Sequence, residues 1–318
     1  MKKFFIAIVA LAAAVSCSND DIISIDRQAI DFGNAFVDNA TRIEDPSYGA
    51  GKLIKEFYVY GTVTGNGNTV TLYNGATVTR GTDQNYGDIW SCTQTEYWVP
   101  SCTYAFQAVV DGAIADGKIA YTVGQDSDND GISDLLYATA AATTNGAATP
   151  SGDIANDCVV FTFEHLLSKV GFTFTNTTGG KYSYNVTGVS FTDHDSTGTY
   201  TIGTGWDTTV SKSATALSFG APGVVASTTP VSAPTTHQII PGTQTLKVTI
   251  NYDIYYDGKN VSPNLSVTED LEYPFAKNIA YNIAVELPAP GQPIQFSVAA
   301  TNGIGAWGNG GDVDLDKE

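Results

Sequence analysis

Basic side chains, cysteine and methionine are scarce in this chain. It has 15 Lys and Arg against 33 Asp and Glu, a net charge of -18, 4 Cys and 1 Met among 318 residues. A chain this acidic is repelled by nucleic-acid phosphates and by anionic lipids, so we expect no nucleic-acid partner. The acidic excess is typical of a protein that must stay soluble on a crowded surface.

The usual sequence signatures of enzymes are also missing. The chain has no G-x-S-x-G, no H-E-x-x-H and no glycine-rich loop for phosphates. Its histidines, His165, His194 and His237, do not follow the spacing of a catalytic or metal-binding pattern. No two of its many carboxylates stand out as an acid pair for glycoside hydrolysis. We therefore predict that the protein is not an enzyme and needs no cofactor.

A single long apolar run is present, and it lies at the N-terminus. Lys2 and Lys3 precede residues 4–15, which are too few to span a bilayer and typical of a cleaved signal peptide. The run ends in V-S-C, which resembles the lipobox of a bacterial lipoprotein. We predict a signal peptide over residues 1–16 and acylation of Cys17. The alternative is an ordinary secretory signal followed by a chance cysteine.

The residues after Cys17 indicate where the mature chain is held. Residues 18–21 read S-N-D-D. They resemble the acidic tag that directs some Gram-negative lipoproteins to the outer face of the outer membrane. We expect the mature chain to be a soluble body tethered there, at the cell outer membrane, through the lipid on Cys17.

The rest of the chain has the composition of a β-protein. Its 32 Gly and 17 Tyr accompany recurrent Thr and Val, and long amphipathic helical patterns are hard to find. Apolar residues alternate clearly over 103–110 and 245–256, and Asn74-Gly75 is a strong hairpin turn. Short strands separated by turn signals favour β-sandwiches, and the length suits two domains with a junction near residues 155–165.

Three cysteines remain beyond Cys17, and three pairings are open to them. Cys92 and Cys102 are close enough in sequence to close a hairpin, so they are the candidate disulfide in an oxidising compartment. Cys158 begins an apolar run and is expected to be a buried thiol. The sequence alone does not choose among the pairings.

One acidic segment resembles the first part of a calcium loop. Its carboxylates stand at relative positions 1, 3, 5 and 9 with glycine at position 6. The candidate calcium ligands are Asp126, Asp128, Asp130 and Asp134. Tyr137 stands where the final Glu of an EF-hand belongs. The alternative is a solvated acidic turn that leads into the next strand.

Several segments in order along the chain resemble the fimbrillin family, the Mfa-like pilus subunits of type V fimbriae. The most specific is F-x-H-x-L-S-K-V within residues 161–170. The others are Thr41-Arg42, Tyr58-Val59-Tyr60, Leu72-Tyr73-Asn74-Gly75, Asp134-Leu135-Leu136-Tyr137-Ala138, Tyr281-Asn282-Ile283, and Ile294-Gln295-Phe296-Ser297-Val298 with Trp307 beyond.

The resemblance implies an all-β chain of two tandem transthyretin-like β-sandwich domains, here 43–160 and 161–318, after a lipidated arm over 17–42. It also implies that a surface arginine-specific protease removes the arm, which carries a strand of the first domain. In this chain the cut would fall between Arg42 and Ile43. The removable strand would carry Ile30, Phe32, Phe36 and Val37.

The resemblance further implies that a strand of a neighbouring fimbrial subunit fills the vacated place, so that subunits form an adhesive fibre. The candidate donor residues are Ile294, Phe296, Val298, Val313 and Leu315. The short segment after Trp307 leaves open a tip or accessory subunit that accepts a strand without donating one. An alternative function is a monomeric surface lipoprotein that keeps its arm and binds a glycan or a host protein.

Overall fold

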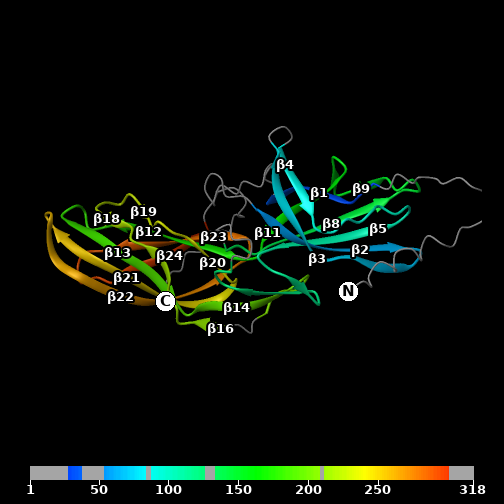
Figure 1. The fold of residues 1–318 in the computed structure, drawn as a ribbon. Helices are drawn as coiled ribbons and strands as arrows, with labels where there is room; N and C mark the ends of the chain where they lie inside the picture. Colours follow the sequence, from blue (N-terminus) through cyan, green and yellow to red (C-terminus); the bar gives the residue numbers. More distant parts are fainter. Residues whose placement is uncertain (1–27, 38–53, 84–86, 126–132, 208–210, 301–318) are drawn as a thin grey trace, which may run out of the picture.

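The computed structural model describes residues 28–37, 54–83, 87–125, 133–207 and 211–300. The regular secondary structure in these ranges is β-strand. In the same ranges, twenty-four strands form sheets in two lobes that lie end to end (Figure 1). The all-β prediction is confirmed. Within the described ranges, no helix has the length and apolarity needed to cross a bilayer.

The first lobe is built on a nine-stranded sheet with the order β1-β11-β8-β5-β2-β3-β4, to which β9 and β10 add at β8 and β11. Along β5 the side chains of Tyr104, Phe106 and Ala108 are buried and alternate with outward ones, which confirms the predicted alternation. These strands are β1 (Asp31–Val37), β2 (Glu56–Gly65), β3 (Asn68–Asp83), β4 (Gly87–Cys92), β5 (Thr103–Val110), β8 (Leu136–Thr144), β9 (Pro150–Gly152), β10 (Ile154–Ala155) and β11 (Cys158–His165).

The second lobe packs two five-stranded sheets around its own core, one ordered β19-β12-β23-β24 with β20 and the other β17-β13-β21-β22 with β18. In β21, Leu246, Val248 and Ile250 are fully buried on one face, as the sequence predicts. These strands are β12 (Ser168–Asn176), β13 (Tyr182–Thr192), β17 (Leu217–Gly220), β18 (Gly223–Val225), β19 (Val231–Ser232), β20 (His237–Ile239), β21 (Gly242–Tyr256), β22 (Lys259–Phe275), β23 (Ile279–Leu287) and β24 (Gln295–Ala300).

A fourth sheet joins segments from the two halves of the chain. In it β7 (Lys118–Thr122) pairs antiparallel with β14 (His194–Thr201), and β6 (Ile114–Ala115), β15 (Gly205–Trp206) and β16 (Ser211–Ser213) complete it. Under this sheet lies a third apolar cluster, which we call the junction core. Its buried members are Val109, Ile119, Tyr121, Leu135, Leu166, Leu167, Tyr200 and Ile240.

The junction core ties the two lobes together. The first half of the chain contributes residues of β5 and β7 and Leu135, which precedes β8. The second half contributes the turn between β11 and β12, β14, and Ile240, which follows β20. β11 continues the first sheet as far as His165, so the boundary expected between residues 160 and 161 falls inside that strand.

Candidate functional site

The first strand, β1, lies at one end of the large sheet and belongs to the candidate site. It runs parallel to β11, with Asp31 opposite Cys158 and Val37 opposite Phe163. Antiparallel strands can be joined by a tight turn, but parallel neighbours must be far apart in sequence or joined by a long crossover. β1 is therefore added to a sheet whose other strands come from later in the chain.

The residues just before β1 are held from a second side. The amide of Ile30 donates to the carbonyl of Glu96 at 2.8 Å, and the amide of Trp98 donates to the carbonyl of Gln28 at 3.1 Å. Residues 28–37 are thus bonded through their backbone first to the segment 96–98 and then to β11.

The side chains of Ile30 and Phe32 point into the first lobe and are 2% and 3% exposed. Burying two such side chains stabilises the seated strand by roughly 3–6 kcal/mol in transfer terms. The ring of Phe32 lies at centroid distances of 5.4 Å from Tyr73, 5.9 Å from Phe161, 6.0 Å from Phe106 and 6.5 Å from Phe57. We call β11, residues 96–98 and these four rings the β1 groove.

The structure places some of the other predicted residues and not the rest. Phe36 and Val37 extend the backbone pairing with β11, opposite Thr162 and Phe163. The lipidation site, the cleavage site and the last two candidate donor residues lie outside the described residues: Cys17, Arg42, Ile43, Val313 and Leu315.

The candidate donor segment lies at the edge of the second lobe. Among the described strands, β24 pairs with β23 alone, antiparallel, with Val298 opposite Ile283 and Phe296 opposite Val285. Val298 is 1% exposed, whereas Phe296 and Ile294 are half-buried against the second core. One face of this strand therefore already contributes to its own lobe, and its outer backbone edge is the last of the sheet.

The cysteines correct one sequence-based prediction. Cys92, Cys102 and Cys158 are free thiols, so the candidate disulfide between Cys92 and Cys102 is not formed. Cys92 ends β4 and Cys102 precedes β5, and the sheet places β2 and β3 between those strands. Neighbouring strands are about 4.8 Å apart, and three such spacings separate β4 from β5. The two cysteines are therefore farther apart than the about 7 Å between Cα atoms that a disulfide tolerates.

Burial, full at Cys102 and partial at Cys92 and Cys158, makes these thiols poor nucleophiles, and Cys158 is less buried than the sequence suggested. Burial is the main cause that raises the pKa of Cys92, Cys102 and Cys158, and the carboxylate of Asp31 adds to the rise at Cys92 and Cys158. A thiol with a raised pKa is mostly protonated at neutral pH, and the thiolate is the reactive form.

The carboxylate of Asp134 is used inside the protein. It is buried, and its Oδ2 lies 2.5 Å from Nδ1 of His165, which is fully buried. The other three candidate calcium ligands, Asp126, Asp128 and Asp130, lie outside the described residues. Among the residues that the structure does describe, no three His, Cys, Asp or Glu side chains gather as a metal site.

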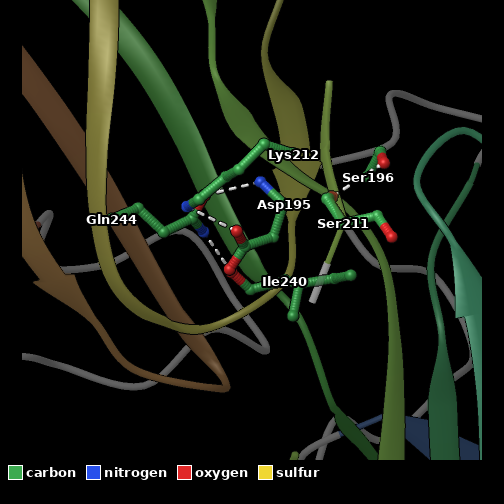
Figure 2. Close-up of polar contacts among 6 residues, drawn as sticks. All are labelled: Asp195, Ser196, Ser211, Lys212, Ile240 and Gln244. Carbon is green, nitrogen blue, oxygen red and sulfur yellow. Dashed lines mark hydrogen bonds and ion pairs between the residues drawn. The ribbon is translucent and has the colours of Figure 1, made fainter. Parts of the chain in front are cut away.

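A polar network links β14, β16 and β21 beside the junction core. Figure 2 shows Lys212 reaching the carboxylate of Asp195, with 2.5 Å between Nζ and Oδ1. The amide of Asp195 donates to Oε1 of Gln244 at 2.9 Å, and Nε2 of Gln244 donates to the carbonyl of Ile240 at 2.5 Å. The ion pair and these hydrogen bonds connect β14, β16 and β21, so the network fixes the fourth sheet against the second lobe.

His194, next to this network, makes stability depend on pH. Burial lowers the pKa of His194, although Asp195 and Asp193 oppose the shift. The unfolded chain therefore binds a proton at higher pH than the folded one, and stability present above pH 6.5 is lost as the pH falls. Below pH 6.5, we expect the free energy of unfolding of His194→Gln to fall less steeply than that of the parent, by up to about 1.4 kcal/mol per pH unit.

The measurement is urea unfolding of parent and variant at pH 8, 7, 6 and 5. The difference between the two curves isolates the contribution of His194 together with its coupling to Asp193 and Asp195. Parallel losses of stability from pH 7 to pH 5 would show that His194 is not the group responsible.

A family model and two solved structures that resemble this chain are of fimbrial or cell adhesion proteins. The family model described as fimbrillin-like matches residues 41–302. A fimbrial protein from Bacteroides vulgatus superposes with a TM-score of 0.59 at 15% identity, covering 86% of this chain and 98% of that one. A candidate cell adhesion protein from Bacteroides uniformis superposes with a TM-score of 0.52 at 15% identity, covering 88% and 98%. Among curated proteins, none matches the sequence.

Proposed function

This chain belongs to the fimbrillin-like family, and we propose that it is a structural fimbrial subunit that assembles by exchanging its first strand. The observation that carries the proposal is the placement of β1. Two side chains of an N-terminal segment fill the core of the first lobe, and the strand that bears them lies at a sheet edge, parallel to β11.

Removal of β1 would leave a place that only another strand can fill. The backbone groups of β11 that face β1 would lose their partners, and the pockets of Ile30 and Phe32 would be empty. A strand from a neighbouring subunit restores the hydrogen bonds and buries its own apolar face, which is β-augmentation. Such a contact joins unlike surfaces head to tail and does not close, so it builds a filament.

Release begins with proteolysis in this proposal. Arg42 follows β1, and a cut between Arg42 and Ile43 separates β1 from the lobe that it completes. A cut at Arg27 would leave β1 attached to the rest of the chain. The precursor is an outer-membrane lipoprotein held through Cys17, so the same cut frees the subunit from its lipid.

The second lobe supplies the donating strand. β24 is an edge strand with one neighbour in the part of the chain that the structure describes, and the alternation of Ile294, Phe296 and Val298 gives one apolar face. Outward peeling of an edge strand breaks only one ladder of hydrogen bonds. The chain beyond residue 300 carries Val313 and Leu315, which would extend the donated face.

The test compares Arg42→Ala with Arg27→Ala, each expressed in the native cells. For parent and Arg27→Ala, we expect sheared material whose chains begin at Ile43 and which forms a gel ladder that collapses on boiling. For Arg42→Ala, we expect a lipidated monomer that begins at Cys17. Chains of the parent that begin at Cys17 and never polymerise would contradict the proposal and leave a monomeric surface-binding lipoprotein.

A further inference from the structure

Gly33, the residue after Phe32, sits where no other side chain fits. It pairs with Val160 of β11, and a Cβ added to it would lie 2.9 Å from Cβ of Cys158 and 3.3 Å from its Sγ. Real Cβ atoms do not approach each other so closely. Because Cβ of Cys158 is fixed to its backbone, no rotation of that side chain makes room.

We propose that the β1 groove selects its strand by an apolar-x-aromatic-glycine pattern, and that Cys158 is the specificity-determining residue that requires the glycine. Ile30 and Phe32 supply the first two requirements, because both side chains are buried in the groove. Gly33 supplies the third. The inference rests on the proposed strand exchange. It specifies the residue types of the strand that replaces β1, provided that this strand takes the direction and register of β1.

The pattern excludes this chain's own donor segment. Residues 294–297 read I-Q-F-S, and residues 30–33 read I-D-F-G. The two segments share the apolar and aromatic residues. They differ at the second residue, which is exposed in β1, and at the fourth, whose Cβ would approach Cys158. In the register of β1, the Cβ of Ser297 would meet that of Cys158. The occupant is therefore a glycine-bearing strand of a different subunit, and β24 donates to a groove other than that of a second copy.

Another segment of the described chain carries the pattern but is not free to use it. Residues 217–220 read L-S-F-G. Phe219 is fully buried in the second core, with its ring 4.7 Å from that of Phe172. Its release would open the second lobe, so it does not compete for the groove.

The first experiment measures how firmly β1 is seated in the full chain, by hydrogen exchange of residues 28–37. We expect Gly33→Ala to speed exchange about tenfold or more, since forcing a methyl group into a filled site is strongly destabilising. Cys158→Gly in the same chain should restore slow exchange, because it removes the opposing Cβ. Cys158→Ala should not, because it keeps that Cβ. Gly146→Ala is the matched control, since a Cβ there meets nothing within 4 Å.

The second experiment grafts the sequence of β24 onto β1. Asp31→Gln alone gives I-Q-F-G, and Asp31→Gln with Gly33→Ser gives I-Q-F-S. We expect the first to exchange like the parent and the second about tenfold faster or more. Equal exchange of the two grafts, or rescue of Gly33→Ala by Cys158→Ala, would overturn the selection rule. Both measurements use the uncut chain, so they stand whether or not Arg42 is cleaved.

A third measurement identifies the occupant in fimbriae from the native cells. A photo-crosslinking residue at Val160, whose partner is Gly33, should capture a strand with the apolar-x-aromatic-glycine pattern from another chain. Capture of residues 294–300 from a second copy would overturn the inference. If no strand is captured but the hydrogen-exchange results are as expected, the proposed strand exchange is wrong. The requirement for glycine in the seated β1 strand would still hold.

Discussion

Replacing Phe32 with alanine is expected to lower the free energy of unfolding of the first lobe by about 3–5 kcal/mol. The side chain is 3% exposed and contacts four aromatic rings from four different strands. Three of those contacts are edge-on, a geometry that adds to simple burial. Truncation leaves a cavity among rings from β2, β3, β5 and β11, which cannot collapse without moving those strands. Urea unfolding with an unchanged m-value measures the loss.

Asp31→Ala is the matched control for Phe32→Ala. Asp31 is the preceding residue of the same strand, but its side chain is exposed, so its loss should change stability by less than about 0.5 kcal/mol. A loss below about 1 kcal/mol for Phe32→Ala would mean that the lobe does not depend on β1. The proposal that cleavage empties an essential place in the fold would then lose its physical basis.

The sequence predicted the strands whose side chains alternate. In β5 and β21 the apolar residues recur every second position, and a strand is the local structure that buries such a set on one face. Local periodicity was sufficient there because one face meets a core and the other does not. For the arm, the family resemblance placed Ile30 and Phe32 on a strand of the first domain, and the structure shows that both side chains are buried in the first core.

Contacts between distant segments could not be predicted in this way. The register that puts Gly33 beside Cys158 depends on a parallel pairing between the two ends of the first lobe. The pairing of β7 with β14, which builds the fourth sheet, likewise joins segments from different halves of the chain. Neither leaves a periodic signal, because a pairing partner is chosen by tertiary packing.

The cysteine prediction failed for a related reason. Short sequence separation suggested that Cys92 and Cys102 close a hairpin, but β4 and β5 are not neighbours in the sheet. The strand order places β2 and β3, which come earlier in the chain, between them. Proximity in sequence indicates a hairpin only when consecutive strands pair, which roughly one third of sequential strands do not do.

Leu166→Ala is expected to weaken both lobes together, with a loss of about 2–5 kcal/mol. Leu166 is fully buried in the junction core. Its amide donates to the carbonyl of Leu135 at 2.9 Å, and its carbonyl accepts from Nε1 of Trp206 at 2.8 Å. The residue thus links the first lobe to the fourth sheet through its side chain and its backbone.

The measurement for Leu166→Ala is hydrogen exchange across the described strands. We expect faster exchange in β5 and β8 of the first lobe and in β14 beside the second. Leu246→Ala is the matched control, because Leu246 is equally buried but belongs to the second core alone. Its effect should be confined to the second lobe.

The two variants separate a shared core from independent lobes. If Leu166→Ala changed exchange on one side only, the junction core would not couple the lobes. In a fibre assembled as we propose, a subunit is pulled at the β1 groove of the first lobe and at β24 of the second. Tension then crosses the chain between them, and the junction core is the apolar cluster to which both halves contribute. In such a fibre, coupled unfolding through Leu166 would let one subunit bear load as a single unit.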